Sequence, residues 1–323
     1  MTFAALSFAA GFLIGGFPVV LKPAIYFDYA FREWQSGSTG GFGLWQIDTV
    51  SGWVFYLKTL GWGMGVPLLT LGIAGVLHRI FKAVTRRDWM SLLLLAFLMT
   101  YYLFMGVTRH YFARYAVPLV PFVALFAGEA LTDGIAAIRG RRPALEWGVL
   151  IIATIGFIIL PLSRSIRSDH LLTVEDTRVV AKKWVETNVP DGAKIAIDWV
   201  TYGPPLSTLE RSVPHSNRVY DATSIGGTGL ADRPITWYRE QGFEYLIASS
   251  FIYNIPLVYE DRHQERQAFY EALDQEFRLI KEFYPDESGS EPPFIFDEIY
   301  GPAVSLWHRE RPGPVMKIYQ VVD

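Results

Sequence analysis

The feature that most constrains this chain is a series of long apolar stretches in its first half. A helix needs about 20 apolar residues to cross the hydrocarbon core of a membrane. Five stretches reach or approach that length, and they cover residues 2–21, 53–77, 90–107, 115–131 and 147–162. The sequence therefore predicts an all-α membrane bundle of about five spans over residues 1–162.

Residues 163–323 have the composition of a water-soluble domain. The whole chain has 19% charged residues, against about 25% in an average soluble protein, but most of its 32 acidic residues lie in this second half. Apolar spacing predicts strands at residues 194–198, 218–221, 245–248, 279–283 and 317–322, and helices at residues 177–188, 234–241 and 261–276. Strands that alternate with helices predict a small α/β domain with a parallel or mixed sheet.

The first apolar stretch and the segment after it each allow two interpretations. Residues 2–21 resemble a signal peptide in position, but they lack a basic start and are long for one, so we expect a membrane helix. Residues 22–52 are expected to form a loop at the membrane surface, because they combine turn residues with many aromatic residues. The alternative is a substrate-facing loop in which Asp28, Glu33 and Asp48 are available for acid–base chemistry.

Basic residues predict the orientation of the bundle. The loop at residues 78–88 has four Lys or Arg residues and the loop at residues 132–146 has three, and alternating spans place both loops on one side. The positive-inside rule makes that side cytoplasmic. We therefore expect a multi-pass protein of the cytoplasmic (inner) membrane, with residues 22–52 and the domain at 163–323 outside the cytoplasm.

Three potentially cationic residues, Arg109, His110 and Arg114, lie between the third and fourth spans. They fall on the outer side, where the positive-inside rule disfavours cations, so we expect them to have a task. A guanidinium group suits a phosphate, and lipid phosphates lie at this depth. The aromatic residues expected to line a slot for the lipid tail are Tyr101, Tyr102 and Tyr115. The alternative is a charged turn that contacts ordinary lipid phosphates.

Other chemistry has little support in the sequence. The chain has no cysteine, which excludes disulfides and thiol catalysis. Its six histidines lack the spacing of metal ligands, and it has no P-loop or serine nucleophile motif. The glycine-rich residues 225–229 do not join a clear strand to a helix and are expected to form a turn. The net charge of −3 argues neither for nor against nucleic acid, but the chain has no basic stripe, so we expect no nucleic-acid partner. We also expect no cofactor and no metal site in this chain, and the metal dependence of its activity stays open.

The stretch RHYFARYAVPLVPFVALFAGEAL, residues 109–131, resembles the late membrane helices of the GT-C membrane glycosyltransferases. It is most similar to the bacterial enzymes related to protein O-mannosyltransferases and to the aminoarabinose lipid A transferase. Their R-Y-x-x-P-x-x-P pattern is matched by Arg114, Tyr115, Pro118 and Pro121. Residues 55–79 resemble the helix pair after a large outer loop in those enzymes, and residues 176–198 resemble the start of their outer C-terminal domain.

The resemblance implies transfer of a sugar from a polyprenyl-phosphate carrier to an acceptor outside the cytoplasmic membrane. The lipid-linked sugar is then a co-substrate, and Arg109, His110 and Arg114 hold its phosphate. The family's catalytic base lies in an acidic outer loop after the first helix, but the stretches matched here correspond to later helices. Asp28 and Glu33 do not align with that base.

The chain is therefore expected to be the C-terminal part of such an enzyme. It is then either a fragment or one half of a split enzyme whose N-terminal half comes from another chain. Two alternatives remain open. One is a non-catalytic membrane-anchored protein whose outer domain binds a partner or an envelope polymer. The other is a piece of a transporter, which the scarcity of ionisable residues inside the spans disfavours.

Overall fold

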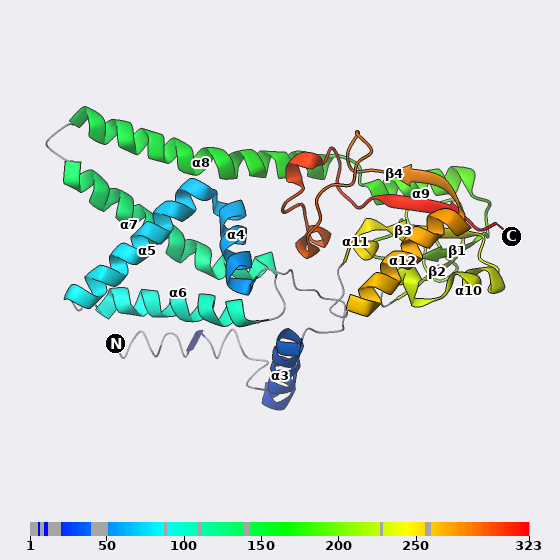
Figure 1. The fold of residues 1–323 in the computed structure, drawn as a ribbon, viewed down its shortest axis with the longest axis horizontal. Helices are drawn as coiled ribbons and strands as arrows, with labels where there is room; N and C mark the ends of the chain where they lie inside the picture. The colour runs from blue at the N-terminus through cyan, green and yellow to red at the C-terminus, as the bar shows by residue number, and fades with distance from the viewer. Residues whose placement is uncertain are drawn as a thin grey trace.

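The structure is a computed structural model with a helical half and a sheet domain, joined by one long helix (Figure 1). It describes residues 6, 10–11, 21–39, 51–86, 89–108, 112–138, 143–226, 229–255 and 260–322. Most of the expected first span, residues 2–21, lies outside the described residues, as do residues 109–111. The remaining expected elements are compared with the structure below.

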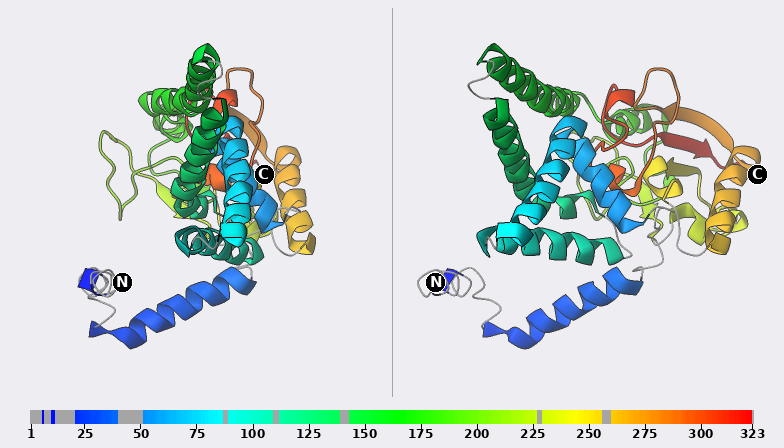
Figure 2. Two further views of the ribbon diagram at one scale, coloured as in Figure 1. Left: turned by 90° about the vertical axis from the view of Figure 1, so that its left-hand side faces the viewer. Right: turned by 60° about the vertical axis from the view of Figure 1, so that its left-hand side comes forward.

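Most of the expected loop at residues 22–52 that the structure describes is a helix, α3 (Pro23–Thr39). Proline is tolerated in a first helical turn, where its missing N–H has no partner to lose. An ion pair between Asp28 and Arg32, 2.9 Å long and one turn apart, also favours a helix. The loop prediction was wrong because the Gly and Ser residues that prompted it occur only from Ser36 onward. In both figures α3 lies apart from the other helices (Figures 1 and 2).

The single helix expected over residues 53–77 is two helices. α4 (Gly52–Met64) and α5 (Val66–Arg86) meet at Gly65, which has a φ of 81°. Only glycine adopts this left-handed conformation at little cost, and Pro67 cannot donate the hydrogen bond that would continue α4. The two helices form a corner (Figure 1). α5 also continues through residues 78–86, which were expected to form a loop.

The other helices of this half follow the expected stretches with different bounds. α6 (Trp89–Val107) covers residues 90–107. The next stretch begins as a tight 3-10 turn, η1 (Ala113–Leu119), and continues as α7 (Val120–Ile138). α8 (Pro143–Thr173) is much longer than the expected 147–162, because it passes through Pro161 and carries polar residues toward the sheet domain.

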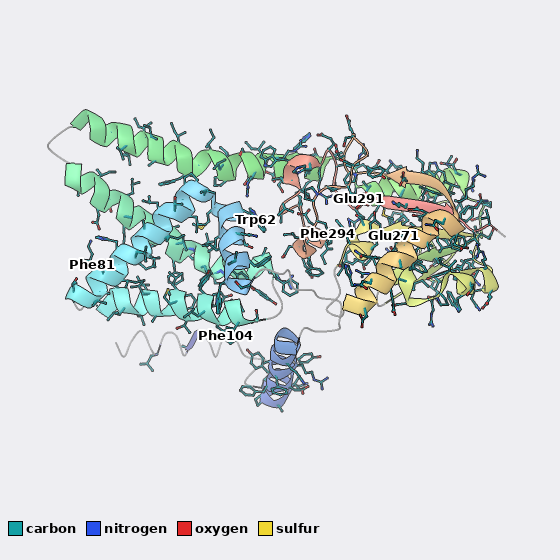
Figure 3. The ribbon with its side chains drawn as sticks, viewed as in Figure 1. Trp62, Phe81, Phe104, Glu271, Glu291 and Phe294 are labelled. Carbon is teal, nitrogen blue, oxygen red and sulfur yellow. The ribbon has the colours of Figure 1, made fainter. Side chains whose placement is uncertain are left out.

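Three described helical stretches are long and apolar enough to cross a membrane, and they are Val66–Thr85, Ala113–Ala136 and Trp147–Asn188. The third includes the break at residues 174–176 between α8 and the first helix of the sheet domain. A shorter apolar helix covers Ser91–Val107. Large apolar side chains such as Phe81 and Phe104 are exposed on these helices (Figure 3). Such surfaces are typical of a protein embedded in lipid.

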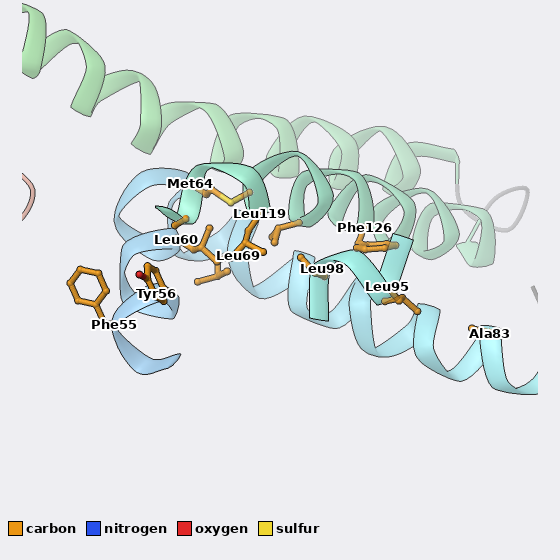
Figure 4. Packing of buried hydrophobic residues seen from close by; sticks show 12 residues of the cluster. Phe55, Tyr56, Leu60, Met64, Leu69, Ala83, Leu95, Leu98, Leu119 and Phe126 are labelled. Atoms are coloured by element: carbon orange, nitrogen blue, oxygen red, sulfur yellow. The ribbon is translucent and has the colours of Figure 1, made fainter. Parts of the chain in front are cut away.

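α5 and α7 pack with their backbones in close contact. A Cβ atom placed on Gly75 would lie 2.0 Å from the carbonyl oxygen of Phe126. Small residues allow this approach, which is common between membrane helices. Phe126 belongs to a buried cluster that also contains Leu60, Met64 and Leu119 (Figure 4).

Ion pairs join α5 and α7 at the end of the bundle away from the sheet domain. Arg79 lies 2.5 Å from Glu129 and Lys82 lies 2.6 Å from Asp133, measured between nitrogen and oxygen. The basic segment at the end of α5 and the end of α7 thus lie together. The turn at η1 lies at the opposite end, beside the sheet domain (Figure 1).

The sheet domain has five strands in the order β2-β1-β3-β5-β4. They are β1 (Lys194–Ile197), β2 (Asp221–Ser224), β3 (Tyr245–Ser249), β4 (Arg278–Phe283) and β5 (Met316–Gln320). β1 runs parallel to β2 and β3, whereas β5 runs antiparallel to β3 and β4. The expectation of a mixed sheet is therefore confirmed.

Helices cover both faces of this sheet. Ile195 and Ile247 point to the face covered by α9 (Thr177–Asn188), and the alternate residue Leu246 points to the face covered by α12 (Glu260–Glu276). This alternation follows from the two-residue period of a strand. The remaining short helices are η2 (Gly229–Asp232), α10 (Ile235–Glu240), α11 (Ser250–Tyr253), η3 (Phe296–Ile299) and η4 (Leu306–His308).

Between β4 and β5 the chain leaves the sheet and reaches the helical half. We call residues 294–309 the strap. Glu298, whose side chain is fully buried, organises the strap by accepting hydrogen bonds from the backbone N–H groups of Ala303, Val304 and Ser305 at 2.9, 2.7 and 3.2 Å. It also pairs with the buried Arg309 at 3.3 Å. A buried charge with this many partners fixes a loop in one conformation.

Candidate functional site

A cavity of about 350 Å³ lies where the helical half meets the strap. Its wall is mostly apolar, with a few hydroxyl groups and one cation. We call it the junction cavity, and its lining residues are Thr59, Trp62 and Gly63 of α4, Ala113 of η1, Pro161, Arg164, Ser165 and Ser168 of α8, and Pro302, Ala303 and Leu306 of the strap. Figure 3 shows Trp62 and Phe294 on the two sides of this junction. An apolar pocket with a few polar groups is typical of a site for a small amphiphilic ligand.

Arg164 is placed by the end of α4. The last carbonyl groups of a helix have no partner within it, and Arg164 donates from Nη1 to the carbonyl oxygen of Trp62. One turn later, Arg167 donates to the carbonyl oxygen of Arg309 in the strap. α8 thus binds both α4 and the strap, and it brings a guanidinium group to the wall of the cavity.

Thr59 contributes a polar atom that has no partner in the described part of the chain. Its Oγ1 is buried, and the residues that the structure describes offer it no hydrogen bond. Within a helix, a threonine hydroxyl usually bonds the carbonyl oxygen three or four residues earlier. A buried hydroxyl without a partner costs free energy.

Arg114 is the member of the predicted phosphate-binding trio that the structure describes; Arg109 and His110 lie outside the described residues. It directly follows Ala113, which lines the cavity. Its guanidinium lies over the rings of Phe112 and Tyr300, 4.2 and 4.9 Å from their centroids. Arg114 is nevertheless exposed. The aromatic rings hold the cation in place at the end of the bundle.

The structure places the three predicted lipid-slot tyrosines against the buried cluster of the bundle. Tyr101 donates its hydroxyl to the carbonyl oxygen of Tyr115 at 3.0 Å, and Tyr102 donates to that of Trp53 at 2.8 Å. All three rings pack on the cluster shown in Figure 4. None of them is among the lining residues of the junction cavity. A slot between these rings therefore stays a prediction.

The two predicted acid–base candidates lie on α3. Asp28 is exposed and paired with Arg32. For Glu33 the structure describes the backbone, within α3. Since α3 lies apart from the other helices in both figures, the structure does not bring Asp28 to the junction cavity (Figures 1 and 2).

The strap contributes Asp297, a residue that the sequence analysis did not select. Its Oδ1 accepts a hydrogen bond from the backbone N–H of Ala113 at 2.9 Å. Burial raises the pKa of the Asp297 carboxyl, and the Ala113 N–H and the charge of Arg114 act in the opposite direction. Asp297 thus connects the sheet domain to the turn that carries Arg114.

A further buried carboxylate, Asp198, lies at the end of β1. Its oxygens accept hydrogen bonds from the N–H of Leu230 and the N–H of Ser249, both at 2.7 Å, and from the hydroxyl of Tyr270 at 2.5 Å. Burial raises the pKa of Asp198 to about 6 although these hydrogen bonds lower it. The three donors belong to η2, β3 and α12, so Asp198 joins three elements at this end of the sheet.

Sequence reasoning missed Arg164 and Asp297 for different reasons. Arg164 follows the last apolar stretch directly, on the side that the sequence analysis expects to lie outside the cytoplasm. The reasoning applied to Arg109 and Arg114 would have selected it too. Asp297 gave no signal, because its partner Ala113 is far away in the sequence. In the described residues, no group of three or more His, Asp or Glu side chains is placed to hold a metal ion.

Comparison with known proteins gives a coarse likeness only. The sequence matches no model of a protein family, and no curated protein matches it significantly. Two crystal structures of the Archaeoglobus fulgidus oligosaccharyltransferase align with part of the chain. The structure tethered to an acceptor peptide containing the NVT sequon has 14% identity and a TM-score of 0.38, and the apo form has 15% identity and a TM-score of 0.40.

Each alignment covers 72% of this chain and 32% of the oligosaccharyltransferase. The chain thus spans about a third of the length of these solved proteins. A likeness at this level establishes neither a family nor an activity for the chain.

Proposed function

We propose that this chain is the C-terminal part of a GT-C type membrane glycosyltransferase, which moves a sugar from a polyprenyl-phosphate carrier to an acceptor outside the cytoplasmic membrane. The observation that supports this best is the junction cavity, in which an apolar wall and the cation of Arg164 lie at the end of candidate membrane helices. Arg114 directly follows Ala113, which lines the cavity. A lipid-linked phosphate needs this combination of an apolar surface and guanidinium groups at the membrane boundary.

The reaction we propose is a displacement at the anomeric carbon of the sugar. The bond from this carbon to the phosphate oxygen breaks and a bond to the acceptor oxygen forms, with inversion. A base takes the proton of the acceptor hydroxyl, and Arg114 offsets the charge on the leaving lipid phosphate. Asp28 and Glu33 are the candidates for this base within the chain. Alternatively, the base belongs to an N-terminal half of the enzyme, which either precedes residue 1 or is supplied by another chain.

The arrangement of charges supports the proposed orientation. The basic end of α5 pairs with α7 at one end of the bundle, and the sheet domain lies at the other. If the basic end is cytoplasmic, then Arg114, the junction cavity and the sheet domain face the outside. That is the side on which a polyprenyl-phosphate sugar would be used.

Binding of a polyprenyl phosphate by the chain in lipid nanodiscs tests the proposal. Arg114→Ala should weaken binding about tenfold or more, because a hydrogen bond to a charged group contributes about 1.5–3 kcal/mol, and Arg114→Lys should recover part of the loss. Arg32→Ala is the matched control, since Arg32 is an exposed arginine on α3. Equal affinity in all variants would contradict the site. If the unmodified chain binds no polyprenyl phosphate, the alternative of a non-catalytic binding protein is favoured.

A further inference from the structure

The strap contacts the turn that carries Arg114 in several independent ways. Asp297 accepts the hydrogen bond from Ala113, as described above. The ring of Phe112 packs against the rings of Phe296 and Tyr300, with centroids 5.8 and 6.1 Å away, and these two rings also contact each other at 6.0 Å. The strap thus touches the backbone just before Arg114, and through Tyr300 it touches the guanidinium itself.

The strap is also fixed at its other end. Arg309 donates from Nη1 to the carbonyl oxygen of Gly313 and from Nε to the hydroxyl of Ser305, both at 2.5 Å. Arg167 of α8 binds the carbonyl oxygen of Arg309 and lies 3.3 Å from Glu310. The strap binds both α8 and η1, which line the junction cavity. A movement of the strap together with the sheet domain would therefore also move the wall of the cavity.

Asp297 is not placed where stability alone would put a carboxylate. Asp297 is only 7% exposed, and its Oδ2 is buried with no hydrogen-bond partner in the described part of the chain. A half-satisfied buried carboxylate destabilises a fold. Glu298, the next residue, shows the contrast, because both of its oxygens have partners. Costly local arrangements of this kind are expected at functional sites.

We infer that the strap positions the Arg114 turn for phosphate binding, and that Asp297 is the positioning residue through which the sheet domain controls the donor site. Asp297 acts on the ligand only through the backbone of Ala113 and the placement of Arg114. The identity of the ligand rests on the proposed function. The docking of the strap on the turn rests on the contacts alone.

Two variants of Asp297 separate positioning from charge. Asp297→Ala removes the acceptor for the Ala113 N–H. Asp297→Asn keeps an oxygen acceptor and removes the charge. Tyr300→Ala is a second route to the same turn, and it is expected to fold because Tyr300 is 56% exposed. Asp261→Ala, an exposed aspartate on α12, is the matched control.

The full-length variants in nanodiscs are measured in two ways, by hydrogen–deuterium exchange of the peptide covering residues 112–119 and by affinity for a polyprenyl phosphate. We expect Asp297→Ala and Tyr300→Ala to speed exchange of that peptide and to lower the affinity about tenfold. Asp297→Asn should recover most of both, and Asp261→Ala should change neither.

The possible results distinguish this inference from the proposed function. Unchanged exchange in Asp297→Ala and in Tyr300→Ala would overturn the docking of the strap. Faster exchange with unchanged affinity would overturn the positioning role. If Asp297→Asn behaves like Asp297→Ala, the hydrogen bond to Ala113 is not the means of positioning. If exchange responds as expected but the unmodified chain binds no polyprenyl phosphate, the docking stands and the proposed function fails.

Discussion

Three buried carboxylates influence the conformation and the stability of the sheet domain. Glu298 is paired with Arg309 and bonded to three backbone N–H groups, so it holds the strap in one conformation. Asp297 next to it keeps one oxygen without a partner in the described part of the chain. Asp198 has three donors but is so deeply buried that the pKa of its carboxyl rises to about 6. Each carboxylate therefore has a different consequence for stability.

The raised pKa of Asp198 predicts a stability that depends on pH. The folded state holds the Asp198 proton up to about pH 6, whereas an unfolded aspartate loses it near pH 3.9. The unfolding free energy of the wild-type chain should therefore fall, relative to that of Asp198→Asn, by about 2 kcal/mol as the pH rises from 4 to 7. Urea unfolding of both chains in detergent measures this difference. The same pH dependence in both chains would contradict the account.

Among the elements, the break between α4 and α5 decides where the junction cavity lies. Gly65 turns the chain so that the carbonyl of Trp62 faces Arg164 of α8. A straight helix over residues 53–77 would have no exposed carbonyl groups there for Arg164 to bind. The corner at Gly65 thus supplies one wall of the site, and the strap supplies another.

The packing of α5 on α7 leads to a second prediction. A side chain at Gly75 would overlap the backbone of Phe126, so Gly75→Leu should separate the two helices and destabilise the bundle by roughly 1–3 kcal/mol. Gly134→Leu is the matched control, since a Cβ atom there meets nothing within 4 Å. Thermal unfolding in detergent compares them. Equal midpoints for the two variants would show that α5 and α7 do not pack as described.

Regular elements could be predicted from the sequence where one pattern dominates. The alternating strand at residues 194–198 and the amphipathic helix at residues 177–188 lie close to β1 and α9. The corner at Gly65 was missed because hydropathy is the same on both sides of it. α3 was missed because the aromatic residues and the turn residues of residues 22–52 were interpreted together as a loop at the membrane surface. A high apolar content predicts a segment buried in lipid, but it does not predict where a helix bends or ends.

The candidate site could be predicted only in part. Arg114 was selected because it lies between the third and fourth apolar stretches, on the side expected to be outer. Its neighbours Tyr300 and Asp297 come from the strap, more than 180 residues later in the chain. Contacts across such separations depend on how the two halves dock, which no local pattern encodes. The positive-inside rule that selected Arg114 applies equally to Arg164, but Arg164 was not selected.

At the scale of the whole molecule, the two ends of the bundle carry different chemistry. One end has the ion pairs of α5 with α7, and the other has Arg114, the junction cavity and the strap. Since the chain has no cysteine, single introduced cysteines report on each end without background. This makes the proposed orientation directly measurable.

We expect a cysteine at Thr85, near the end of α5, to be protected from a membrane-impermeant maleimide in intact cells with a permeable outer envelope. A cysteine at Ser288, in the sheet domain, should react. Disrupting the membrane should make Thr85→Cys reactive and leave Ser288→Cys unchanged. The opposite pattern would place Arg114 in the cytosol and would contradict the proposed function.

Photolabelling with a diazirine-bearing polyprenyl phosphate tests the central claim most directly, namely that a lipid-linked phosphate occupies the junction cavity. After irradiation in nanodiscs, mass spectrometry should find the label on peptides that contain Thr59–Gly63 and Pro161–Ser168, and Arg114→Ala should reduce it about tenfold. Label spread over the exposed faces of α5 and α6, with the same yield in Arg114→Ala, would contradict the account.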